Sequence, residues 1–198
     1  MNQINMTVEK YFPTPMGFGY NVELAQKYLP LVQEMLSNPK SYNPSFFPNG
    51  RTTHHTEFEI AKMPEFKEMR DWIYELGSEF MHQCGFRRDS LKNEVFMIAN
   101  ALNYGGFHKS HTHFDCALSG VIYLNAPEGS SAVEFEDPID SRKMRKYPIE
   151  DPNNPLTWEF IYTQPQVGLY NIWPLWFRHM VLQNESTEPR IAVAFNIG

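Results

Sequence analysis

From about residue 94 to its end, the sequence is a succession of short β-rich runs separated by turn residues. The runs are "EVFMIANALNY", "CALSGVIYLN", "SAVEFED", "LTWEFIYTQ", "VGLYNIW", "FRHMVLQN" and "RIAVAFNIG". No helical pattern of useful length interrupts them. This spacing favours a sandwich or a barrel, because a half-apolar strand needs a second sheet or a closed wall to cover it.

Two helical patterns precede these strands. In "NVELAQKYLPLVQEMLSNP", apolar residues recur at helical spacing after Asn21, a possible N-cap, and Pro30 is expected to kink or divide the helix. The stronger pattern covers residues 64–86, with Pro64 at its start and Gly85 as its stop. A short strand is expected within residues 8–20. Helices followed by strands predict an α+β, mainly β fold with the helices on one face.

Composition narrows the class of protein. The 198 residues suit one domain, with residues 1–93 as helical N-terminal support, residues 94–198 as the β core and residues 137–155 as an insertion. The net charge of −6 argues against nucleic acid as a partner. There are two cysteines, and no stretch approaches the ~20 apolar residues of a membrane span. We therefore expect a soluble cytoplasmic protein with no membrane partner.

The segment "HKSHTHFD", residues 108–115, holds three histidines and an aspartate in eight positions. If it is extended, His111, His113 and Asp115 point to one face, because side chains alternate along a strand. These are more metal ligands than most sites take from one strand. A further histidine, His179, begins a strand 66 residues after His113 in "WPLWFRHMVLQN". Two imidazoles and one carboxylate on one face of an octahedral metal form the facial triad of non-haem Fe(II) oxygenases.

The last strand, "RIAVAFNIG", has two faces of different character. One face is plainly core, and the other carries Arg190, Ala192, Ala194 and Asn196. Small residues beside a buried cation indicate a cavity that holds an anion, since a packed barrel interior would carry large apolar residues there. Arginine is suited to a carboxylate because its planar fork makes a bidentate pair.

In the order in which they occur, "GGFHKSHTH", "LSGVIYLN", "WPLWFRHMV" and "RIAVAFNIG" resemble the 2-oxoglutarate- and Fe(II)-dependent oxygenases, and in particular oxygenases of bacteria and tailed phages. The N-terminal "YFPTP" is similar to the family's opening motif. The resemblance implies a double-stranded β-helix, or jelly-roll, barrel. It implies Fe(II) held by His113, Asp115 and His179, with His111 behind the ligands or in the substrate pocket.

The resemblance also implies a cosubstrate site and a reaction. Arg190 would hold the far carboxylate of 2-oxoglutarate, and "IYLN" is similar to a strand of prolyl 4-hydroxylases in which a tyrosine, here Tyr123, reaches that cosubstrate. Tyr104 matches a second tyrosine upstream of the histidines. Dioxygen and 2-oxoglutarate would be consumed, succinate and carbon dioxide released, and an unactivated C–H bond hydroxylated. The substrate, a small molecule or a peptide, is left open, and the loops at 37–57 and 137–155 are where it is expected to bind.

Two alternatives remain from the sequence. Cupins have a similar barrel, and "GGFHKSHTH" fits the first part of their motif, which gives a three-histidine site of His111, His113 and His179. The cupin glutamate falls at Ala117 or Leu118, however, and Trp176 stands where cupins have glycine. The other alternative is a non-catalytic barrel that binds a sugar or a peptide and holds no metal at neutral pH.

Overall fold

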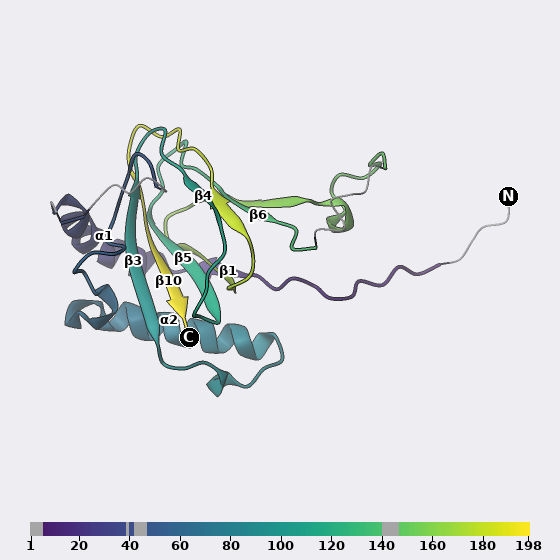
Figure 1. Ribbon diagram of the computed structural model, residues 1–198, viewed down its shortest axis with the longest axis horizontal. Coiled ribbons are helices and arrows are strands. Elements are labelled where there is room, and N and C mark those ends of the chain that lie inside the picture. Colours follow the sequence, from purple (N-terminus) through teal and green to yellow (C-terminus); the bar gives the residue numbers. More distant parts are fainter. Residues whose placement is uncertain (1–5, 39, 42–46, 140–146) are drawn as a thin grey trace.

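Two antiparallel sheets face one another in the computed structural model (Figure 1), which describes residues 6–38, 40–41, 47–139 and 147–198. The larger sheet has the order β1-β8-β5-β10-β3-β2, and the smaller has the order β4-β9-β6-β7. The larger sheet contains β1 (Gly17–Tyr20), β2 (Gly50–Thr52), β3 (Val95–Leu102), β5 (Leu118–Asn125), β8 (Leu169–Pro174) and β10 (Arg190–Ile197). The smaller contains β4 (His108–His111), β6 (Val133–Glu136), β7 (Phe160–Thr163) and β9 (His179–Val181). The predicted mainly β fold with two sheets is confirmed.

Alternation along the central strands divides the larger sheet into an inner and an outer face. On β10, Val193 and Phe195 belong to the core on the outer face, whereas Ala192 packs with Tyr123 and Trp173 on the inner face. The register places Ala192 opposite Tyr123 of β5, and Asn196 opposite Ser119. The predicted division of "RIAVAFNIG" into a core face and a small-residue face is therefore confirmed.

Both long helices cover the outer face of the larger sheet (Figure 1). Helix α1 (Val22–Ser37) begins as expected, with the Leu24 N–H donating to the Asn21 side chain at 3.1 Å. Pro30 does not divide α1, which is continuous through it. Pro30 and Gln26 are both exposed, so the Gln26 carbonyl that loses its helical partner faces water.

Helix α2 (Lys67–Gln83) lies where the second pattern predicted it, with its start three residues later because Pro64–Phe66 form a 3-10 turn, η2. Gly85 has a φ of +88°, which explains why the helix ends before it. The apolar stripe packs inward: Met69 and Ile73 are fully buried. Burial of each such side chain contributes roughly 1.5–3 kcal/mol.

The remaining segments are short. The other 3-10 turns are η1 (Ile60–Lys62), η3 (Arg88–Ser90) and η5 (Pro155–Thr157). The strand expected within residues 8–20 is limited to β1. Parts of the two loops expected to bind substrate, residues 39, 42–46 and 140–146, lie outside the described residues. The division of the chain near residue 94 and a lid role for 137–155 stay predictions. Within the described ranges, no helix is long and apolar enough to cross a membrane.

Candidate metal and cosubstrate site

Three histidines converge between the two sheets. One ring nitrogen from each of His111, His113 and His179 lies within 4.8 Å of the others. Strand pairing explains this convergence, because His111 at the end of β4 is directly opposite His179 at the start of β9. His113 follows β4, and its backbone N–H donates to the Leu175 carbonyl at 3.0 Å. This is the only such group of potential ligands in the part of the chain that the structure describes.

Backbone carbonyls orient two of these rings. Nδ1 of His179 lies 2.8 Å from the Phe177 carbonyl, and Nδ1 of His111 lies 2.8 Å from the Lys109 carbonyl. Each Nδ1 therefore carries a proton and donates it, which leaves Nε2 with a free lone pair. Nε2 of His179 lies 3.4 Å from Nε2 of His113. Ligating histidines are commonly fixed in this way by a hydrogen bond from the opposite ring nitrogen.

Burial keeps the cluster neutral. Desolvation lowers the pKa of His179 to about 3 and that of His113 to about 4, and it also lowers the pKa of His111. The neighbouring histidines lower the first two further. At neutral pH the three imidazoles are therefore uncharged, which is the form that binds a metal.

A fourth histidine lies beside the cluster and was not singled out from the sequence. The ring centroids of His108 and His111 are 4.2 Å apart. A register shift between these two residues in the β4–β9 pair accounts for their closeness, since residues three apart point to opposite faces of a regular strand. Burial lowers the pKa of His108 to about 3, with His111 as the next cause. Strand alternation alone gives no signal for this contact.

Asp115 does not join the histidines. The extended segment on which that expectation depended ends at His111, and Asp115 has a φ of +56°, in the left-handed region. Its side chain is exposed and lines a cavity at the end of the larger sheet. The predicted placement of His111, His113 and Asp115 on one face of a strand is thus corrected: His111 takes the third place in the group.

Arg190 and Tyr123 meet on the inner face of the larger sheet, as expected. The Arg190 guanidinium carbon lies 4.7 Å from the centre of the Tyr123 ring, and the two residues are 4% and 0% exposed. Among the described residues, neither the Tyr123 hydroxyl nor Arg190 Nε has a hydrogen-bond partner. Trp173 Nε1 and Asn171 Oδ1, from β8 on the same face, are also buried without one. Buried polar atoms need partners, and the Tyr123 hydroxyl, Arg190 Nε and Trp173 Nε1 are donors that fit a small anionic ligand, whereas Asn171 Oδ1 only accepts.

Tyr104 lies elsewhere. Its side chain is 64% exposed in the turn between β3 and β4, and its contact with the cosubstrate stays a prediction. Trp173 supplies an aromatic wall instead, with its ring 4.8 Å from that of His179. Ser119 was also missed by sequence reasoning, although it precedes Val121 and Tyr123 at strand spacing. Its hydroxyl lies 3.0 Å from Nε2 of His113.

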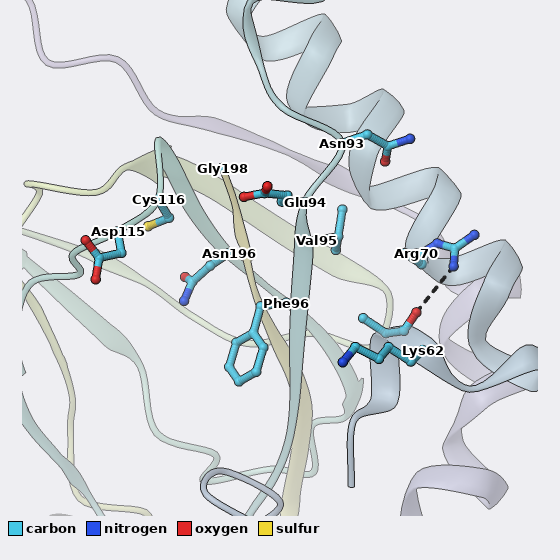
Figure 2. Close-up of a pocket in the computed structure, with 11 residues that line it drawn as sticks. Lys62, Arg70, Asn93, Glu94, Val95, Phe96, Asp115, Cys116, Asn196 and Gly198 are labelled. Carbon is cyan, nitrogen blue, oxygen red and sulfur yellow. Dashed lines mark hydrogen bonds between the residues drawn. The ribbon is translucent and has the colours of Figure 1, made fainter.

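A cavity of about 580 Å³ opens at the end of β3 and β10 (Figure 2). Asp115, Cys116 and Asn196 lie on one side of β3, and Lys62 and Arg70 lie toward α2 on the other. Burial, followed by the Asp115 carboxylate, raises the pKa of the Cys116 thiol. Cys116 is therefore a protonated thiol at neutral pH and not a nucleophile.

The comparison with protein families identifies the family of the chain. The family model described as "Putative 2OG-Fe(II) oxygenase" matches residues 97–196, half of the chain and every core strand from β3 to β10. The chain belongs to this family. Membership of the 2OG-Fe(II) oxygenases confirms the predicted cofactors, which are Fe(II), 2-oxoglutarate and dioxygen. The cupin alternative is excluded at the level of the family, although its three-histidine set agrees with the geometry.

Solved structures share the fold of this oxygenase. A Pseudomonas putida prolyl-4-hydroxylase is 11% identical, with a TM-score of 0.64 over 93% of this chain and 92% of that one. A prolyl hydroxylase from Trichoplax adhaerens, in complex with a peptide fragment of hypoxia inducible factor, is 8% identical, with a TM-score of 0.61 over 92% and 82%. The α-ketoglutarate-dependent epimerase SnoN is 10% identical, with a TM-score of 0.64 over 92% and 76%. The predicted double-stranded β-helix is thereby confirmed. No curated protein matches the sequence.

Proposed function

We propose that this oxygenase is a hydroxylase whose Fe(II) is held by His111, His113 and His179. The observation that most supports this proposal is the convergence of one ring nitrogen from each histidine, all within 4.8 Å of one another. His111 and His179 have their Nδ1 protons donated to backbone carbonyls, which leaves their Nε2 lone pairs open, and all three rings are neutral at pH 7. Three nitrogen ligands would leave further coordination positions for the cosubstrate and dioxygen.

The same reasoning assigns 2-oxoglutarate to the inner face of the larger sheet. Arg190 would bind its distal carboxylate, because a buried guanidinium without an anionic partner is costly and Nε of Arg190 has no partner among the described residues. The Tyr123 hydroxyl, also unpaired, would donate a second hydrogen bond. Ala192 is directly opposite Tyr123 and two residues from Arg190 on β10, and its small side chain would leave this face to the cosubstrate.

When bound, the iron and cosubstrate supply the oxidation: 2-oxoglutarate and dioxygen are converted to succinate and carbon dioxide, and one oxygen atom enters a substrate C–H bond. The residues of this chain orient the cosubstrate and exclude water. The rings of Trp173 and Phe135 pack on the His179 ring at centroid distances of 4.8 and 5.6 Å, respectively. These contacts exclude water from that side of the site. No side chain is needed as a general base, and none is assigned.

A three-histidine centre differs electrostatically from one with a carboxylate. With three neutral imidazole ligands, the metal and its protein ligands would carry a total charge of 2+. With one carboxylate among the ligands, this total would be 1+. The dianionic cosubstrate then provides the whole charge compensation. We therefore expect Fe(II) and 2-oxoglutarate to bind cooperatively, with each raising the affinity for the other by the same factor.

The test is an anaerobic titration of the Fe(II)-loaded protein with 2-oxoglutarate, followed by the metal-to-ligand absorption band and by isothermal calorimetry. A saturable band with one equivalent bound supports the proposal. Succinate formation that a substrate stimulates, with oxygen incorporated in the product, supports hydroxylation. Absence of the band, together with absence of metal binding at neutral pH, would instead favour the non-catalytic barrel.

A further inference from the structure

The cavity in Figure 2 has two chemically different ends. Toward α2, Lys62 is paired with Glu59 at 2.7 Å, and Arg70 is paired with Asp71 at 2.8 Å. These cations are therefore satisfied and do not attract a further anion. The opposite end, which we call the acceptor end, is lined by Glu94, Phe96, Asp115, Cys116 and Asn196.

Two acceptors at this end have no partner among the described residues. Oδ1 of Asn196 is shielded from solvent and accepts no hydrogen bond. A shielded amide oxygen without a donor is unfavourable, so a ligand nitrogen that reached this atom would satisfy it. The Asp115 carboxylate likewise has neither an ion pair nor a hydrogen bond within the described ranges. Its left-handed backbone, φ +56°, holds it beyond Asn196 at the edge of the cavity (Figure 2).

The acceptor end borders the three-histidine centre. Asn196 of β10 is directly opposite Ser119 of β5, and the Ser119 hydroxyl lies 3.0 Å from Nε2 of His113. Asp115 follows His113 by two residues. Ser119 therefore connects the acceptor end to the three-histidine group, although none of the three histidines lines the cavity itself.

An aromatic face completes this end of the cavity. Phe96 is 47% exposed. It belongs to β3, which pairs with β10 so that Phe96 is directly opposite Asn196. Its ring lines the same cavity (Figure 2). Carboxylate and amide oxygens accept hydrogen bonds from a cationic nitrogen, and an aromatic face attracts the same cation. None of these features suits an anionic group.

We infer that the acceptor end binds a cationic nitrogen group of the substrate, a primary ammonium or a guanidinium, and so orients the C–H bond that is oxidised. This inference depends on the proposed function, because it takes the three-histidine centre as the place of reaction. The substrate class is therefore an amine- or guanidine-bearing small molecule or side chain, rather than a carboxylate or a phosphate.

The probes are butylammonium, butanol and butyrate, titrated into the metal-free full chain and followed by backbone amide NMR shifts. Butylammonium is expected to bind most tightly and butyrate most weakly, with shifts at residues 94–96, 115–116 and 196. Asp115→Asn should weaken butylammonium binding about tenfold, since a charge-assisted hydrogen bond is lost. Asparagine also accepts a positive φ, so this variant keeps the loop. Asn196→Ala should weaken binding as well.

Asp89→Asn is the matched control. Asp89 is an exposed carboxylate paired with Arg87, outside the cavity, and its variant should bind butylammonium as the wild type does. Equal affinity for butylammonium and butyrate, or no effect of Asp115→Asn, would overturn the inference while leaving Fe(II) and 2-oxoglutarate binding intact. Selective butylammonium binding without Fe(II) binding would support the acceptor end as a cation site and would overturn the proposed function.

Discussion

Nε2 of His113 and Nε2 of His179 lie 3.4 Å apart, although 66 residues separate them in sequence. His179 points its Nε2 lone pair at this space because its Nδ1 proton is donated to the Phe177 carbonyl. A proton on Nε2 of His113 can be shared between the two nitrogens in the metal-free protein, and a metal ion can replace it. Together with the nitrogen of His111, within 4.8 Å of both, the pair is suited to a shared metal ion.

His179→Gln and His113→Gln should each lower Fe(II) affinity by at least a hundredfold, because each removes an imidazole ligand and leaves two. Gel filtration followed by metal analysis under anaerobic conditions measures the loss. His55→Gln, at an exposed histidine with a φ of +57°, serves as the control and should retain one equivalent of iron. Full retention of iron in both ligand variants would place the metal elsewhere.

Arg190→Ala should weaken 2-oxoglutarate binding by roughly tenfold to several hundredfold, since hydrogen bonds to a charged group contribute ~1.5–3 kcal/mol each. Arg190→Lys should be intermediate, because it keeps the charge but not the planar fork. Calorimetry of the anaerobic Fe(II) protein gives both values. Iron affinity in the absence of cosubstrate should stay within about threefold in the two variants. An unchanged cosubstrate affinity in Arg190→Ala would exclude Arg190 from the site.

Trp173→Phe should weaken 2-oxoglutarate binding about five- to tenfold. Nε1 of Trp173 is buried without a partner among the described residues, and phenylalanine keeps the ring contact with His179 while it removes the N–H. Trp72→Phe is the control, because Trp72 packs on Tyr170 at the outer face of the sheet. An equal loss in both variants would indicate a general effect on stability.

The metal-free protein should lose stability as the pH falls from 7 to 5. His179 has a pKa of about 3 when folded against 6.5 for an ordinary histidine. Between these values the unfolded chain binds a proton that the folded chain does not, so the free energy of unfolding rises with pH in this window. His179 alone accounts for about 2 kcal/mol between pH 5 and pH 7. Urea unfolding at the two pH values measures it, and a reduced difference is expected in His179→Gln.

The order of elements and the faces of β10 could be predicted from the sequence because they follow from regular alternation. The contact of His113 with His179 followed from the motif order of the family. The third member of the group did not, since alternation was extended past His111 to Asp115, where the backbone turns into the left-handed region. His108 was missed for a related reason: the register shift that brings it to His111 is a property of strand pairing, which a single strand pattern does not encode.

The buried groups on β8 illustrate a second limit. Asn171 and Trp173 share the inner face with Tyr123 only because β8 pairs with β5 in the observed register. That pairing joins segments about fifty residues apart, and sequence periodicity carries no information on it. Tyr104 was matched to the family by its place in the motif order, and that order carries no information on the exposure of its side chain, which lies in an exposed turn.

The most direct test of the three-histidine centre is the Fe(II) content of His111→Gln beside that of Asp115→Asn, each dialysed anaerobically against one equivalent of metal per chain. We predict that Asp115→Asn retains one iron per chain, because the Asp115 carboxylate lies outside the group of converging nitrogens, and that His111→Gln loses it. Retention of iron in His111→Gln together with its loss in Asp115→Asn would contradict the three-histidine centre and would make Asp115 the third metal ligand.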